Sequence, residues 1–96
     1  MEARISILAG DGIGPEVTAE SIKVLEAIGR RFNHSFEWVP GIVGGQAIDE
    51  SGVAISNDTL NLVLGSDAIL FGAVGGPRWD DPKARVRPED GILRLR

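Results

Sequence analysis

The feature that most constrains the fold of this chain is the turn Gly10-Asp11-Gly12-Ile13-Gly14-Pro15, which follows the strand-like run Ile5-Ser6-Ile7-Leu8-Ala9. After the turn, apolar residues recur at helical spacing on one face. They are Val17, Val24, Leu25, Ile28 and Phe32. Pro15 suits the first turn of a helix, where its missing N–H has no intrahelical partner to lose. The pattern therefore predicts a glycine-rich junction between a strand and a helix.

Two interpretations of this junction stay open from the residues alone. The first N–H groups of a helix are unpaired and its dipole is positive there, so a carboxylate or phosphate is favoured at that end. Glycines at 10, 12 and 14 also fit a tight connection that binds nothing. The spacing differs from the dinucleotide fingerprint G-x-G-x-x-G. Counted from Gly10, the third glycine of that fingerprint would stand at position 15, which is proline, so the turn does not predict a Rossmann fold.

Composition limits the class of protein. The chain has 96 residues, 43% hydrophobic and 25% charged, with a net charge of −4, which is typical of a globular sequence of at most one domain. It has no cysteine, which excludes disulfides and thiolate metal sites. No apolar stretch approaches the roughly 18 residues of a membrane span, and the first residues lack the basic-then-apolar order of a signal peptide. We expect a cytoplasmic protein with no membrane partner.

Positive charge gathers at the end of the chain. Residues 78–96 carry six Lys and Arg against four Asp and Glu, whereas residues 1–77 carry four against ten. The six basic residues could bind a carboxylate or phosphate; on composition alone, a solvated charged loop is the better interpretation. They are Arg78, Lys83, Arg85, Arg87, Arg94 and Arg96. Nucleic acid is not expected as a partner, because the pI is about 4.8 and no aromatic residues interleave with the basic segment.

The order of the predicted elements indicates an α/β fold, a parallel-containing sheet flanked by helices. Strands are predicted near 4–9, 35–40 and 67–73, helices near 15–31 and 57–65, and an extra helical turn at 46–49. Ser56 or Asn57 opens the second helix. The apolar run 67–73 is typical of a strand covered on both faces. Residues 88–96 begin like a helix but lack a C-terminal signal, so we expect residues 1–96 to form a single incomplete α/β domain, the N-terminal portion of a longer protein.

Three motifs resemble the β-decarboxylating dehydrogenases, the family of isocitrate and isopropylmalate dehydrogenases. They are residues 8–17 (LAGDGIGPEV), residues 72–80 (GAVGGPRWD) and Arg87-Pro88-Glu89. The first motif is shared across the family. The Gly-Gly-Pro-Arg-Trp stretch within residues 72–80 resembles the isopropylmalate branch, and Gly44-Gly45-Gln46-Ala47-Ile48-Asp49 resembles a Gly-Gly-x-Ala-Ile-Asp segment of that branch.

The resemblance implies the family's own fold, which is not a Rossmann fold, and a homodimeric oxidoreductase of leucine biosynthesis. Such an enzyme oxidises (2R,3S)-3-isopropylmalate with NAD, and the 3-carboxy-4-methyl-2-oxopentanoate formed loses carbon dioxide to give 4-methyl-2-oxopentanoate, with Mg²⁺ or Mn²⁺ beside the substrate. Tartrate and homoisocitrate dehydrogenases are alternatives within the family. A non-catalytic anion-binding module and a dimerisation fragment are alternatives outside it.

The resemblance also assigns residues. The stretch from Gly76 to Glu89 resembles an NAD-binding segment, in which Glu89 faces the nicotinamide ribose and Ile13 lines the cofactor side. Within that stretch, Pro77, Arg78 and Trp79 follow Gly76, and Pro77 and Trp79 shape the loop.

On the substrate side, Arg96 aligns with the first arginine that grips a malate carboxylate, and Ile92 with the position that packs on the isopropyl branch. Arg94 and His34 are expected to be solvated surface residues. Catalytic and metal-binding residues are expected beyond Arg96, with none in this chain, so residues 1–96 alone are not expected to catalyse.

Overall fold

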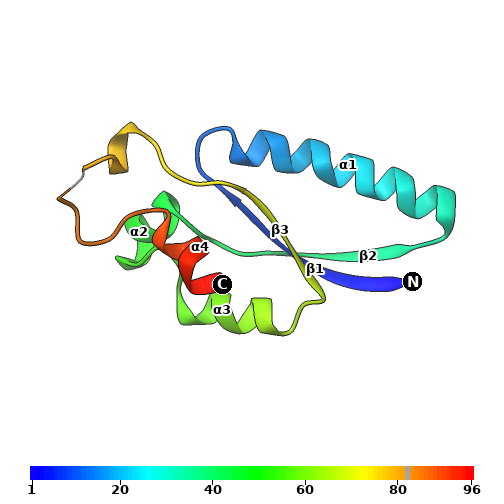
Figure 1. Ribbon diagram of the computed structural model, residues 1–96. Coiled ribbons are helices and arrows are strands. Elements are labelled where there is room, and N and C mark those ends of the chain that lie inside the picture. Colours follow the sequence, from blue (N-terminus) through cyan, green and yellow to red (C-terminus); the bar gives the residue numbers. More distant parts are fainter. Residues whose placement is uncertain (82) are drawn as a thin grey trace.

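The computed structural model describes residues 1–81 and 83–96, and its centre is a parallel sheet of three strands (Figure 1). The strands are β1 (Glu2–Gly10), β2 (Ser35–Pro40) and β3 (Ala68–Ala73), in the order β2-β1-β3. In this register Ile5 of β1 lies opposite Trp38 of β2 and Ala68 of β3. The expectation of an α/β fold with parallel strands is confirmed.

The helices are α1 (Gly14–Phe32), α2 (Gly45–Ser51), α3 (Asn57–Leu64) and α4 (Asp90–Leu95), with a 3₁₀ turn η1 at Pro77–Trp79. Helix α1 connects β1 to β2, and α2 and α3 connect β2 to β3, as parallel pairing requires, while α4 follows β3. Helix α1 runs along one side of the sheet, while α2, α3 and α4 gather on the other (Figure 1). The turn predicted at 46–49 is a helix of seven residues; η1 was not predicted.

The core lies on the side of the sheet away from α1. Leu8 of β1, Val43 and Ile55 are almost fully buried and form one cluster. The side chains packed against this cluster come from α3, β3, the loop after it and α4. They are Leu60, Val63, Phe71, Val74 and Leu95. The cluster therefore joins the central strand to helices of that side.

The expectation that residues 67–73 form a strand covered on both faces is wrong. Asp67, Ala68 and Ile69 are exposed, and the rest of the run is only half-buried. The reason is the strand order: β1 occupies the centre of the sheet and β3 an edge. An apolar run shows that a strand can be buried, but the position of that strand in the sheet decides whether the described residues bury it.

Helix α1 contacts the sheet through small residues. Its buried residues are Gly14, Thr18 and Gly29, and a Cβ atom at Gly72 of β3 would come 2.7 Å from the Thr18 hydroxyl oxygen. Most of the apolar residues predicted to share one face of this helix are exposed, by 40–63% for Val17, Val24, Ile28 and Phe32. The helix forms as predicted, but the described part of the chain leaves much of its apolar surface uncovered.

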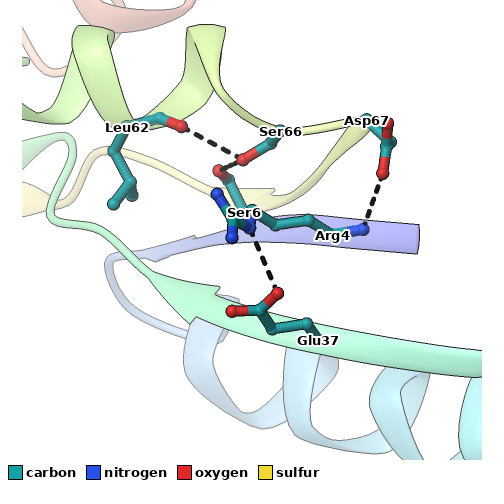
Figure 2. Close-up of polar contacts among 6 residues, drawn as sticks. All are labelled: Arg4, Ser6, Glu37, Leu62, Ser66 and Asp67. Carbon is teal, nitrogen blue, oxygen red and sulfur yellow. Dashed lines mark hydrogen bonds and ion pairs between the residues drawn. The ribbon is translucent and has the colours of Figure 1, made fainter. Parts of the chain in front are cut away.

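A chain of hydroxyl groups ties β1 to the segment after α3 (Figure 2). The Ser66 hydroxyl donates to the carbonyl of Leu62 at 3.1 Å. Because a hydroxyl has one proton to donate, the fully buried Ser6 hydroxyl must be the donor in its short bond to Ser66. The buried polar group on the central strand is thereby satisfied, as burial demands.

Arg4 makes a second set of contacts at the amino ends of the strands (Figure 2). Its backbone N–H donates to Asp67 at 2.8 Å, and its Nε donates to Glu37 of β2 at 3.1 Å. A shallow depression of about 430 Å³ lies at this end. Its lining residues are Glu2, Ala3, Arg4, Ser35, Phe36, Glu37, Gly65 and Asp67. This end of the sheet is opposite the one at which the glycine-rich turn emerges.

Candidate functional site

The loops at the carboxyl ends of the strands form the candidate site. β1 ends at Gly10, β2 at Pro40 and β3 at Ala73, and parallel strands place these ends at one edge. In open α/β sheets, ligands bind at the carboxyl ends of the strands. The site lies between two neighbouring strands whose following connections run to opposite sides of the sheet. Strand β1 lies between β2 and β3, so the loop after β1 and the loop after β3 meet at such a point.

Glycines allow these two loops to approach closely. A Cβ atom at Gly10 would overlap the carbonyl oxygen of Ala73, and one at Gly14 would overlap the carbonyl oxygen of Ala9. Gly10 also has a φ of +82°, which side chains disfavour. Packing therefore requires glycine at the first and last glycine positions of the turn. This agrees with the tight connection, one of the two interpretations that the sequence left open.

Gly12 and Gly75 differ from these two glycines because they border open space. Both have positive φ, +56° and +105°. A Cβ atom at Gly75 would meet nothing within 4 Å, and one at Gly12 would reach only the Gly75 carbonyl oxygen at 4.0 Å. The backbone at both positions is therefore bare on its outer side. Such a surface fits a ligand that approaches the main chain closely.

The Asp11 carboxylate links three segments at this edge. Its Oδ2 accepts hydrogen bonds from the N–H groups of Gly45 at 2.7 Å and Gly75 at 3.0 Å, and its Oδ1 accepts from Gln46 at 3.2 Å. The Asp11 backbone N–H donates to the Ala73 carbonyl at 2.6 Å. The residue is only 6% exposed. Sequence reasoning assigned it no role; its position among the glycines was the one available signal.

The predicted cofactor residues before position 80 lie in these loops. Ile13 is exposed in the turn between β1 and α1, Gly76 precedes η1, and η1 consists of Pro77, Arg78 and Trp79. Because Asp11 joins the turn to Gly75, the structure brings Ile13 and the start of the 76–79 segment to the same edge of the sheet.

The 76–79 segment rests on α2. The Trp79 indole lies over Gly45, and its Nε1 donates to Asp49 of α2 at 3.3 Å. Arg78 forms an ion pair with the same Asp49 at 3.5 Å, with its guanidinium 5.8 Å from the Trp79 ring centroid. The segments 44–49 and 76–79, which carry two of the sequence motifs, are therefore in direct contact.

Glu89 lies apart from these loops, at the start of α4. Glu89 is half-buried, and its carboxylate forms an ion pair with Arg87 Nε at 3.0 Å. The angle at this Nε–H group does not meet the geometry of a hydrogen bond. The Arg87 N–H donates to Asp90 at 2.9 Å. Among residues 1–81 and 83–96, no hydrogen bond or ion pair joins Glu89 to Ile13 or to the 76–79 segment. Pro82, inside the predicted NAD stretch, lies outside the described residues.

Helix α4 contains Ile92, one predicted substrate residue, has the other, Arg96, as its C-cap, and packs on the core. A Cβ atom at Gly91 would come 2.9 Å from Val43, so the helix approaches the β2–α2 connection closely. Ile92 is half-buried, Arg96 is exposed, and the Arg96 N–H donates to the Ile92 carbonyl at 3.3 Å. The four-residue spacing puts both side chains on neighbouring positions of one face.

Arg94 is more than a solvated residue. It is exposed, but its guanidinium donates to the Ile55 carbonyl and to Asn57 Oδ1, both at 3.3 Å. These bonds tie α4 to the start of α3. Arg94 is therefore exposed as expected, but the sequence did not show that α4 folds back against residues 55–57.

His34 is half-buried at the end of β2 remote from the candidate site. Within residues 1–81 and 83–96, no group of three or more His, Asp or Glu side chains could hold a metal ion. No helix in the same described residues is both long enough and apolar enough to cross a membrane.

Comparisons with known proteins agree on one family. The model of the family described as isocitrate/isopropylmalate dehydrogenase matches residues 4–96. The chain is 54% identical over 96 residues to the 3-isopropylmalate dehydrogenase of Dehalococcoides mccartyi and 53% identical over 96 residues to that of Anaeromyxobacter dehalogenans. These alignments cover all of this chain and 26% and 27% of the relatives.

A solved structure shows the same fold. The chain is similar to the apo form of a β-decarboxylating dehydrogenase from Thermococcus kodakarensis, with a TM-score of 0.67 and 36% identity. The match covers 97% of this chain and 25% of that structure. The chain thus spans about a quarter of the length of the curated and solved relatives that it matches.

Proposed function

Because this chain belongs to the isocitrate/isopropylmalate dehydrogenase family, we propose that it is part of an NAD-dependent 3-isopropylmalate dehydrogenase. The enzyme oxidises the substrate hydroxyl, and the product loses carbon dioxide to give 4-methyl-2-oxopentanoate. The observation that carries this proposal is the identity of 54% and 53% to two enzymes of that name over all 96 residues. Another β-decarboxylating dehydrogenase, for tartrate or homoisocitrate, is the alternative.

The proposed cofactor-binding residues are Ile13, Gly76, Pro77, Arg78, Trp79 and Glu89. Two observations support NAD at the edge where β1 and β3 end. The loops meet at the point where α/β sheets bind ligands, and the backbone of Gly12 and Gly75 is bare toward open space. When bound, NAD accepts a hydride from the substrate. This chain contributes the surface against which the cofactor is held.

Arg96 and Ile92 are the proposed substrate-binding residues. Arg96 binds a malate carboxylate through its guanidinium, which is always charged and can bind in a bidentate way. Ile92 contacts the isopropyl branch, and such a contact discriminates by about 1–3 kcal/mol per methylene-sized difference. Support comes from their four-residue spacing at the end of α4, where Arg96 is the C-cap, and from the exposure of Arg96.

The proposed working unit is a cytoplasmic homodimer in which residues 1–96 are one part of an α/β domain. The described residues leave large apolar side chains exposed, among them Leu64 at 82% and Phe32 at 63%. This exposure supports the proposal that other parts of the enzyme cover these side chains. The proposed metal, Mg²⁺ or Mn²⁺, polarises the substrate oxygen when bound. No residue of this chain is proposed as its ligand, since the described residues form no acidic cluster.

The test is the substrate range of the purified full-length enzyme. Reduction of NAD should be measured with 3-isopropylmalate, tartrate, homoisocitrate and isocitrate, with Mg²⁺ or Mn²⁺ present and with NADP as the alternative cofactor. The proposal predicts the highest kcat/KM for 3-isopropylmalate with NAD. A higher value for another of these acids would contradict it and favour a different branch of the family. Residues 1–96 expressed alone are expected to show no turnover.

A further inference from the structure

Asp11 is a buried carboxylate whose partners are all backbone N–H groups. The three donors belong to Gly45, Gln46 and Gly75. Among the described residues, no cation lies within ion-pair distance of it. A buried charge is costly unless hydrogen bonds compensate for the lost water. The three hydrogen bonds, of 2.7, 3.0 and 3.2 Å, provide that compensation and join the segments that supply them to Asp11.

The carboxylate supplies the cap that α2 lacks in its own sequence. The N-cap residue is Gly44, which has no side chain, and Gly45 and Gln46 are the first residues of the helix. Their N–H groups have no partner within the helix. Asp11 accepts from both, although it lies 34 and 35 residues away in the sequence. A Cβ atom at Gly44 would stand 2.6 Å from Asp11 Oδ2, so glycine there leaves room for the carboxylate.

The same oxygen that caps α2 also fixes the loop after β3. Oδ2 accepts from Gly45 and from Gly75, and Gly75 leads directly into the 76–79 segment. That segment is in turn placed over α2 by Trp79. One carboxylate therefore holds α2 and the beginning of the 76–79 segment in a fixed relationship, next to the turn that carries Ile13.

We propose that Asp11 is a positioning residue for the cofactor: its carboxylate holds Gly75 and α2 so that the 76–79 segment and Ile13 face one NAD molecule. This inference rests on the proposed function. It predicts that loss of the carboxylate weakens NAD binding while leaving the predicted substrate residues on α4 in place.

Asparagine at position 11 tests the proposal with almost no change in shape. An amide has one acceptor oxygen and a donor NH₂ group, whereas the carboxylate only accepts. If the amide oxygen takes the place of Oδ2, the NH₂ group faces the Gln46 N–H. If the amide is turned over, the N–H groups of both Gly45 and Gly75 lose their acceptor. Either orientation leaves at least one N–H unpaired.

The experiment compares Asp11→Asn with Asp67→Asn in the full-length enzyme. Asp67 also accepts a backbone N–H, from Arg4, but at the opposite end of the sheet. NAD affinity is measured by titration calorimetry without substrate, and KM and kcat by steady-state kinetics well below the melting temperature. We expect Asp11→Asn to weaken NAD binding and to raise the KM for NAD about tenfold. The KM for 3-isopropylmalate should stay within about threefold of wild type. The kcat at saturating NAD should change less than the KM for NAD.

Unchanged NAD affinity in a folded Asp11→Asn enzyme that merely melts earlier would show a structural role only and overturn the proposal. An equal rise in the KM for NAD in Asp67→Asn would also overturn the proposal. If Asp11→Asn does not fold, amide hydrogen exchange of the wild-type enzyme decides: protection of the Gly75 N–H before NAD is added supports the proposal, and free exchange contradicts it. A wild-type enzyme that reduces neither NAD nor NADP would contradict the proposed function and this inference with it.

Discussion

The indole of Trp79 lies against Gly45 so closely that any Cβ atom at position 45 would overlap its six-membered ring. The two residues belong to segments that are far apart in the sequence, the first helix after β2 and the 3₁₀ turn after β3. Asp49 strengthens this contact by accepting from the Trp79 Nε1 and pairing with Arg78. Gly45 is therefore needed for a close approach, although its φ is not in the left-handed region.

Gly45→Ala is expected to push Trp79 off α2 and to lower the free energy of unfolding by about 1–3 kcal/mol, the usual cost of overpacking. Gly65→Ala is the matched control. A Cβ atom there would come no closer than 3.6 Å to its nearest neighbour, the Leu62 carbonyl oxygen, and φ is −84°, so the change should be neutral or stabilising by up to about 1 kcal/mol. Denaturant unfolding of both purified full-length variants measures the difference. Equal stability of the two would show that Trp79 does not depend on a bare Gly45.

Ser56 is the N-cap of α3, and its side chain accepts from the Thr59 N–H at 3.1 Å. Ser56→Ala removes that acceptor and should cost about 1 kcal/mol of stability. Ser21→Ala makes the same chemical change on the exposed side of α1, where the hydroxyl only donates back to the Val17 carbonyl. It should change stability by less than about 0.5 kcal/mol. Thermal unfolding compares the two; a larger loss for Ser21→Ala would refute the capping argument.

The sequence predicted most of the secondary structure because local patterns determine it. A short apolar run located β1, helical spacing located α1, and the candidate cap at Ser56 or Asn57 located the start of α3. The same patterns did not show what covers each element. β3 is apolar enough for a central strand, yet β1 occupies the centre. An apolar pattern records which side chains favour burial, whereas strand order depends on contacts across the whole chain.

The candidate site was predicted in part. The glycine-rich turn predicted either a ligand close to the backbone or a tight strand-to-helix connection, but the close approach of Gly10 to Ala73 was not predicted. The role of Asp11 could not be read from the sequence, because its partners lie 34, 35 and 64 residues away. No local rule links an aspartate to N–H groups so distant. The roles of Glu89, Ile92 and Arg96 come from the resemblance and stay predictions.

Glu89→Gln should weaken NAD binding if the carboxylate bonds the ribose hydroxyls. Hydrogen bonds to an ionised acceptor exceed neutral ones by about 1 kcal/mol, so the KM for NAD should rise about fivefold, with the KM for 3-isopropylmalate unchanged. Glu20→Gln is the control, since Glu20 is exposed on α1, and its ion pair within the described part of the chain is with Lys23. Steady-state kinetics of the full-length enzyme measures both. A KM for NAD unaffected by Glu89→Gln would remove Glu89 from the cofactor site.

Arg96 and Arg94 stand two residues apart at the end of the chain and are expected to respond differently to loss of charge. Arg96→Met removes the proposed partner of a substrate carboxylate. Hydrogen bonds to charged groups contribute about 1.5–3 kcal/mol, so the KM for 3-isopropylmalate should rise about 10- to 150-fold. Stability should change by less than about 0.5 kcal/mol, because the Arg96 side chain is exposed.

Arg94→Met should show the opposite pattern. It removes the hydrogen bonds to the Ile55 carbonyl and to Asn57 that tie α4 to the start of α3, so stability should fall by about 1 kcal/mol. The KM of the remaining folded enzyme should stay near that of wild type. Kinetics and thermal unfolding of both full-length variants separate the two roles. If Arg94→Met raised the KM and Arg96→Met did not, the assignment of the substrate arginine would be reversed.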